Sequence, residues 1–316
     1  MASNKVIILG ATGGVGSFAA LAAHEHGAQV VLALRDPQKP IPGISPATEQ
    51  SSGFERVHAD LTKPDTIRAA IAQTGAKRAF VYLAYGTPDH MRSSFAALKE
   101  AGIEFIVFLS GLAVSGNLAS IPPEEFIPWA HAQAEIALGE VFDAGQYVAA
   151  RPGMFATNLL HYKDMIAAGE VQLPYPEAAG DWIASEDTGA VCGALLAKGA
   201  SALEGSETSI PLCGTRRISQ EEAIKIVGRA IGKEVKVSGF DNDEDAARSC
   251  AEVLHLPDSI AKSLVKAMRD MAENSSGDVY AKVNYKEAVG NIRKYGGKEA
   301  TRLEDWAQAN KAKFVE

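Results

Sequence analysis

The sequence predicts an α/β protein in which helices cover both faces of a doubly wound parallel sheet. Short runs of apolar β-forming residues recur through the first half of the chain, and helical stretches separate them. The runs do not alternate with polar residues, as expected of strands that are buried on both faces. Helices between successive strands favour parallel pairing with right-handed crossovers, and such sheets bind ligands at the carboxyl ends of their strands.

Six strands are expected in this sheet. Segment 40–53, after the second of them, is rich in Pro, Ser and Gly and is predicted to be a loop. The strands are predicted at 6–9, 29–34, 54–60, 78–85, 104–111 and 146–150, with helices at 17–27, 64–74, 91–101 and 128–144.

The rhythm of strand and helix breaks after residue 155. We therefore divide the chain into a first part, 1–155, and a smaller, mostly helical part, 156–316, from which segments can return to the sheet. Within the second part, the charged stretch 241–274 is expected to act as a lid or substrate domain. The other elements expected there are a loop at 173–180, helices at 185–198 and 301–314, and a short strand at 208–212.

Helix caps are predicted at two places in the second part. Asp187 lies near the start of helix 185–198, where its side chain is expected to cap free amide groups. Ser219 and Glu222 have the spacing of a capping box ahead of an amphipathic helix.

Composition narrows the possible partners. Of 316 residues, 47% are hydrophobic and 22% charged, which is typical of a soluble globular protein. The net charge of −8 argues against a nucleic acid or an anionic membrane as partner, and no apolar stretch approaches a membrane span. Three cysteines without CxxC spacing suit a reducing cytoplasm and predict no metal site. We expect a cytoplasmic monomer or homodimer that binds a small molecule.

Glycines recur at intervals of three directly after the first strand, at Gly10, Gly13 and Gly16. At a strand-to-helix turn, one glycine permits the tight turn, another lets the backbone approach a phosphate, and a third lets helix pack on strand. A purely structural turn is the alternative, but the following βαβ context favours a dinucleotide. The intervening Thr12, Gly14 and Val15 are expected to contact it as well.

The end of the second strand bears on which dinucleotide binds. An acidic side chain there favours NAD, whereas a cation favours the 2′-phosphate of NADP. Arg35 is the first residue after the second strand, and its guanidinium can bind a phosphate with two hydrogen bonds. Lys39 can add a second positive charge, so NADP is favoured over NAD. Asp36 can instead hold a ribose hydroxyl or cap its own turn, and Arg35 can be a solvated surface residue. Asp60, followed by Leu61, can accept a hydrogen bond from adenine, although helix capping by Thr62 also explains that sequence.

Seven motifs that span most of the chain are informative together: GATGGVG, ALRDP, HADL, FLSG, RPGMFATNLL, ASEDTGA and DWAQANKAKF. In this combination the sequence resembles the NmrA-like family of the atypical short-chain dehydrogenase/reductase superfamily. The resemblance implies a Rossmann fold, NADP at the glycine turn, and a substrate cleft between this fold and a smaller carboxyl-terminal part. It also implies that Ala84 and Gln133 contact the cofactor, that Arg151, Pro152 and Gly153 support the nicotinamide pocket, and that Phe155, Asn158 and Trp182 face the cleft. For the Arg-Pro-Gly segment a purely structural turn is the alternative.

The catalytic pair of ordinary members of that superfamily is missing. They use a Tyr with a Lys four residues later, which places both on one helix face. None of the eight tyrosines here has a Lys at that spacing, and no Lys occurs between Ala101 and Tyr162. Gln133 lies near the position where relatives often keep a Lys, and it cannot supply a charge.

Three side chains are candidates for proton transfer. His131 has an ordinary pKa in the useful range, although a lone helical His is often structural. Ser110 ends the fifth strand and can face substrate or satisfy backbone groups. Tyr85 ends the fourth strand and can be an aromatic wall for the cofactor.

These features leave three functions open. The first is an NADPH-dependent reductase of a small enone, imine or quinone, with the proton from His131, Ser110 or water. The second is a non-catalytic NADP-sensing regulator, which the missing Tyr and Lys favour. The third is a non-redox cyclase or isomerase on the same fold. The pocket-like segment LPYPEAAGDWIA favours an enzyme.

Overall fold

A computed structural model describes residues 4–205, 207–275 and 277–315. Its centre is a parallel sheet of seven strands in the order β3-β2-β1-β4-β5-β6-β9. The order reverses between β1 and β4, which makes the carboxyl ends of these two strands the expected ligand crevice. The strands are β1 (Lys5–Leu9), β2 (Gln29–Leu34), β3 (Glu55–His58), β4 (Arg78–Tyr82), β5 (Phe105–Leu109), β6 (Tyr147–Pro152) and β9 (Ser209–Leu212).

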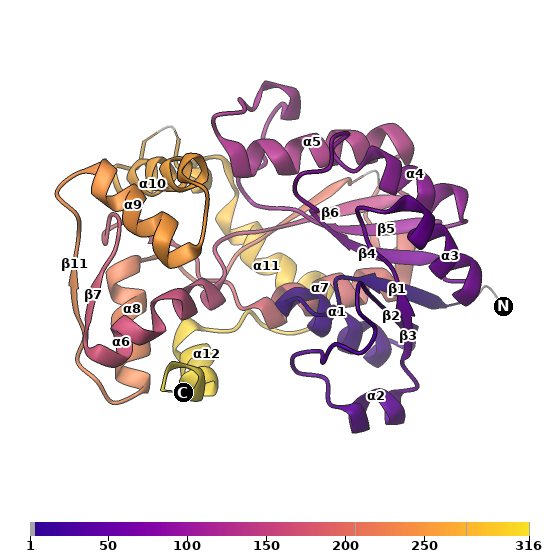
Figure 1. Cartoon of the computed structure of the whole chain (residues 1–316), viewed down its shortest axis with the longest axis horizontal. Helices are drawn as coiled ribbons and strands as arrows, with labels where there is room; N and C mark the ends of the chain where they lie inside the picture. The colour runs from indigo at the N-terminus through magenta and orange to yellow at the C-terminus, as the bar shows by residue number, and fades with distance from the viewer. Residues whose placement is uncertain (1–3, 206, 276, 316) are drawn as a thin grey trace.

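Helices cover both faces of the sheet, so the predicted doubly wound fold is confirmed (Figure 1). Each face has its own hydrophobic core, and the apolar β1 run is at most 2% exposed because both faces are covered. One face carries α1 (Gly14–Glu25), α7 (Ser185–Lys198) and α11 (Tyr285–Gly296), and the other carries α3 (Pro64–Thr74), α4 (Arg92–Glu100) and α5 (Phe126–Val141).

The second half of the chain returns to the sheet. β9 pairs with β6 in parallel, so the sheet has one strand more than the six expected from the sequence. α7 packs closely on α1, and glycines at 189 and 193 permit this approach because a Cβ at either would overlap α1.

The remaining elements form a smaller lobe with its own core, shown at the left of Figure 1. Its helices are α6 (Lys163–Ala168), α8 (Gln220–Ala230), α9 (Asp243–Leu254), α10 (Asp258–Ala272) and α12 (Leu303–Asn310). Short strand pairs join β7 (Glu170–Gln172) to β11 (Lys236–Ser238) and β8 (Ala179–Gly180) to β10 (Ile218–Ser219). Among the described residues, no helix is both long and apolar enough to cross a bilayer.

Several predicted boundaries were wrong; β5, for example, ends at Leu109, one residue before Ser110. α1 begins at Gly14 rather than at residue 17, because glycines can adopt helical geometry in the first turn. The predicted loop 40–53 contains α2 (Pro46–Ser52), which the Ser45 hydroxyl caps. β4 ends at Tyr82, three residues before Tyr85, and β6 extends through Pro152.

The two predicted caps behave differently. Ser219 accepts a hydrogen bond from the Glu222 amide at the start of α8, as predicted. Asp187 makes no cap for α7; it is fully buried and accepts hydrogen bonds from the amide and hydroxyl of Thr301. Lys298 also pairs with Asp187 at 2.9 Å, so this carboxylate fixes the chain between α11 and α12 to α7.

Candidate cofactor and substrate site

The glycine turn between β1 and α1 has the geometry that phosphate binding requires. Gly10 has φ +94°, which favours glycine, and its carbonyl accepts a hydrogen bond from the Gly13 amide at 2.9 Å. A Cβ at Gly16 would overlap the Gly10 carbonyl, so this glycine is needed for helix and strand to pack. A Cβ at Gly13 would meet only that carbonyl, at 3.3 Å, so the backbone is open on its cleft side. These residues fit a dinucleotide pyrophosphate at the α1 N-terminus.

Two adjoining hollows run along the carboxyl ends of the strands, and Gly10, Thr12 and Tyr82 line both. The first, of about 330 Å³, contains the glycine turn with Gly13, Gly14, Val15 and Gly16, and also Leu109, Phe155, Thr157 and Ser185. The second, of about 400 Å³, contains Arg35, Asp36, Lys39 and Leu61. We call the two together the cofactor cleft.

The adenosine end of the cofactor cleft is polar and exposed. Arg35 and Lys39 are solvent-accessible at its rim. Asp36 accepts a hydrogen bond from the Gln38 amide at 2.9 Å, so it caps its own turn. Asp60 accepts hydrogen bonds from the amide and hydroxyl of Thr62. Burial alone would raise the pKa of Asp60, but these hydrogen bonds and the nearby cations Lys63 and Arg35 hold it below its ordinary value.

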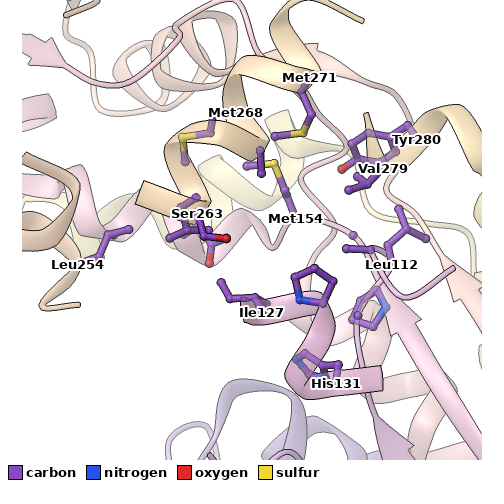
Figure 2. Close-up of a pocket in the computed structure, with 18 of the residues that line it drawn as sticks. Leu112, Ile127, His131, Met154, Leu254, Ser263, Met268, Met271, Val279 and Tyr280 are labelled. Carbon is purple, nitrogen blue, oxygen red and sulfur yellow. The ribbon is translucent and has the colours of Figure 1, made fainter. Parts of the chain in front are cut away.

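A separate apolar cavity of about 430 Å³ lies between α5 and the smaller lobe (Figure 2). Five of the residues singled out from the sequence line it: His131, Pro152, Gly153, Asn158 and Trp182. Residues 152–158 separate this cavity from the cofactor cleft, because Phe155 and Thr157 line the cleft. A backbone bridge between Phe155 and Ile183 holds this segment in place.

His131 lines the cavity, but it does not titrate in the range expected from the sequence. Burial lowers the pKa of its imidazole to about 4, so the ring is neutral at pH 7. Nδ1 is fully buried and has no hydrogen-bond partner among the described residues. The prediction of a titration near neutrality was therefore wrong, since it took no account of burial.

Ser110 and Arg151 meet at a residue that the sequence analysis did not single out. The Ser110 hydroxyl donates to Glu135 Oε1 at 2.5 Å, and Arg151 donates to both carboxylate oxygens. Ser110 and Glu135 are buried, so this hydroxyl is engaged inside the protein and neither residue lines the cleft or the cavity. Arg151 and Pro152 belong to β6 and form no turn.

The remaining predicted residues lie at the edges of the site. Tyr85 is 52% exposed and stacks on Phe126, and its ring centroid lies 6.3 Å from that of His131. Its partly buried position raises the pKa of the phenol. Ala84, Asp60 and Gln133 do not occur among the described residues that line the cleft or the cavity.

Three side chains with polar groups in the cofactor cleft, Tyr82, Thr157 and Ser185, were not singled out from the sequence. The Tyr82 ring covers Gly10, where a Cβ would lie 2.5 Å from Tyr82 Cδ1. Thr157 and Ser185 place hydroxyl groups opposite the glycine turn. Their position within RPGMFATNLL and ASEDTGA was the available signal, since both motifs carried the family resemblance. Within the described ranges, no group of three His, Cys, Asp or Glu side chains could hold a metal ion.

The sheet order and the glycine turn define this chain as a Rossmann-fold dinucleotide-binding protein. Residues 10–197, more than half of the chain, match the family described as NAD(P)H-binding. A nitrogen metabolite regulation-like protein (bik4) of Gibberella fujikuroi is 38% identical over 322 residues, covering 96% of both chains. The chain belongs to this NAD(P)H-binding family and is NmrA-like, as the motifs predicted.

Solved structures share the fold at low identity. A nucleoside-diphosphate-sugar epimerase of Staphylococcus aureus has a TM-score of 0.72 and 16% identity, covering 96% of this chain and 99% of its own. An NADPH-dependent quinone oxidoreductase of Escherichia coli, complexed with NADPH, has a TM-score of 0.68 and 18% identity, covering 96% and 98%. The Citrobacter triphenylmethane reductase complexed with NADP(H) has a TM-score of 0.67 and 16% identity, with the same coverage.

Proposed function

We propose that this protein is an NADPH-dependent reductase of a small organic molecule of the enone, imine or quinone type. The observation that carries the proposal is the apolar cavity on the far side of segment 152–158 from the cofactor cleft. A cavity of this volume lies within the range of about 300–1,000 Å³ common for small-molecule sites. The Escherichia coli and Citrobacter reductases named above lend support by fold alone.

The cofactor would lie across the glycine turn, with the pyrophosphate at the α1 N-terminus and the 2′-phosphate at Arg35 and Lys39. Leu61 would pack on the adenosine end, and Phe155, Thr157 and Ser185 would enclose the opposite end. Arg35 favours NADP over NAD, because Asp36 already caps the turn with its carboxylate. When bound, NADPH supplies the hydride.

The chain's own residues would orient the substrate and polarise it by hydrogen bonding, and the proton that completes the reduction would come from water. The lining of the cavity is mostly apolar, and a bound substrate that displaces water from it would strengthen each polar contact inside. His131, neutral at pH 7, would donate a hydrogen bond to the substrate oxygen or nitrogen from Nε2, since Nδ1 is fully buried. Tyr85 would wall the site beside His131, and Ser110 would act only by positioning Glu135 and Arg151.

We further assign residues 1–155 to cofactor binding and 156–316 to substrate binding, although α7, β9 and α11 return to the sheet. The three cysteines are buried free thiols, which suits a reducing cytoplasm. The net charge of −8 favours a small-molecule ligand over nucleic acid, with the protein a monomer or homodimer.

Label transfer tests this proposal. The protein is incubated with NADPH deuterated at C4 and a panel of enones and imines, and product deuteration is measured by mass spectrometry. The reductase proposal expects deuterium on carbon in one product at least, with no transfer by Gly13→Val. Tight NADPH binding without transfer to carbon, and without NADPH oxidation at 340 nm by quinones, would favour the sensor instead, a function that the bik4 relative's name also suggests.

A further inference from the structure

The apolar cavity carries no permanent charge on its lining. Among the described residues that line it there is no Lys, Arg, Asp or Glu. Two histidines line the cavity: His131 is neutral at pH 7, and His161 is exposed to solvent. An anionic or cationic ligand would therefore lose its hydration there without gaining a counter-charge, which costs several kcal/mol or more.

Charged residues behind the cavity wall are already paired. Tyr280 lines the cavity, and its hydroxyl donates to the buried Asp181 at 2.5 Å. Asp181 also accepts hydrogen bonds from the amides of Met154 and Gly214. Arg217 stacks on the Tyr280 ring at 4.4 Å and donates to Asp278 at 2.9 Å. These charges are satisfied by the protein itself, so none is left for a ligand.

Sulfur atoms gather on one side of the cavity. Met154, Met268 and Met271 line it, and we call these three the methionine wall. Figure 2 shows Met268 and Met271 on α10, across the cavity from Ile127 and His131 of α5. Thioethers make favourable contacts with aromatic rings, about 0.3–1.5 kcal/mol each, and they adapt to ligand shape.

We propose that the cavity selects uncharged, planar aromatic carbonyl compounds of two or three fused rings, such as quinones. The ring system would lie against the methionine wall and between the aromatic side chains of Tyr162, Trp182 and Tyr280. Polar side chains of the lining that can hold its oxygens include His131, Asn158, His161 and Ser263. This inference rests on the proposed function, because it names the substrate class of the same site.

Two probes of equal size test the charge preference. We would titrate the NADP⁺-loaded protein calorimetrically with 2,3-dimethyl-1,4-naphthoquinone, which is neutral, and with 2-hydroxy-3-methyl-1,4-naphthoquinone, which is an anion at pH 7.5. The neutral quinone should bind at least about tenfold more tightly. Equal or tighter binding of the anion, or no binding of the neutral quinone, would overturn the proposal.

Matched variants locate the effect in the cavity. Met268→Lys places a cation in the methionine wall and should reduce the preference for the neutral quinone at least about tenfold. Met268→Leu keeps the volume without charge and should leave the preference unchanged. An unchanged preference in Met268→Lys would mean that the probes bind elsewhere. Decalin-1,4-dione, a saturated and non-planar diketone, tests the preference for planar ligands. If it bound as tightly as the neutral naphthoquinone, the proposed preference for planar rings would be contradicted.

The outcomes separate this inference from the proposed function. Loading with NADP⁺ is measured first, and failure to load counts against the proposed cofactor. The probe titrations need no turnover, so a protein that binds the neutral quinone yet transfers no hydride refutes the reductase and leaves the ligand class supported.

Discussion

Arg151 holds the Glu135 carboxylate through two hydrogen bonds, from Nε at 3.0 Å and from Nη2 at 2.5 Å. The pair joins α5 to the carboxyl end of β6, and Ser110, which follows β5, adds a hydrogen bond at 2.5 Å. His131 lies one helical turn before Glu135, on the same side of α5. The buried pair therefore fixes the helix that carries the proposed hydrogen-bond donor.

Removing the Glu135 carboxylate should destabilise the protein strongly. Glu135→Ala leaves the guanidinium of Arg151 only 15% exposed and without its partner. Breaking a buried pair in this way typically costs about 3–5 kcal/mol. Urea unfolding measures the loss, and Glu135→Gln, which keeps one acceptor oxygen, should lose less. A loss below about 1 kcal/mol for the alanine variant would show that the pair does not stabilise the fold.

Arg35 should decide between the two nicotinamide cofactors. Arg35→Ala should weaken NADPH binding by about 1.5–3 kcal/mol, because a charged hydrogen bond to the 2′-phosphate is lost, and should barely affect NADH. Calorimetric titration of both cofactors measures the difference. Arg68→Ala removes a surface cation outside the cleft and serves as control. Equal losses for NADPH and NADH would remove Arg35 from the proposed phosphate site.

The glycines of the turn should respond differently to substitution. Gly13→Val should abolish NADPH binding and leave the fold largely intact, since its Cβ meets only a carbonyl at 3.3 Å. Gly16→Val should instead destabilise the protein, because its side chain would overlap the Gly10 carbonyl. Calorimetry and thermal unfolding by circular dichroism separate the two effects. Normal NADPH binding by Gly13→Val would mean that the turn does not cradle the cofactor.

His131 should make stability fall in mild acid. Its pKa is about 4 in the folded protein against 6.5 ordinarily, so between these values the unfolded chain binds the extra proton. Folding stability is then complete above pH 6.5 and decreases as the pH falls toward 4. From pH 7.5 to 5.0 the loss from this residue is about 2 kcal/mol. The free energy of unfolding of the parent and of His131→Asn, measured in urea at both pH values, isolates the contribution of this residue. If the two proteins lost equal stability between pH 7.5 and 5.0, His131 would lie in a solvated environment.

Much of the fold follows from local sequence patterns. The β2 strand and the α3 and α7 helices begin and end where apolar periodicity and Gly or Pro signals predict. The place of β9 beside β6 was not predictable in this way, because pairing joins residues about sixty positions apart.

The chemistry of the candidate site was harder to predict from the sequence, because it depends on contacts between residues that are distant along the chain. The sequence suggested Ser110 as a proton donor, but only the folded protein brings it to Glu135. It likewise suggested an ordinary pKa for His131, which burial lowers to about 4. The cavity draws on α10 and on segment 152–158, so its uncharged lining became visible only with the tertiary structure.

The most direct test of the account is NADPH oxidation, followed at 340 nm, by purified protein with a panel of quinones, enones and imines. We expect protein-dependent oxidation with at least one uncharged aromatic quinone. His131→Phe, which removes the hydrogen-bond donor, should bind NADPH as tightly as the parent yet turn over at least about a hundredfold more slowly, because one preorganised donor to the developing negative charge contributes that much. Tight NADPH binding with no oxidation of any panel member would contradict the reductase and identify the protein as a cofactor sensor or a non-redox enzyme.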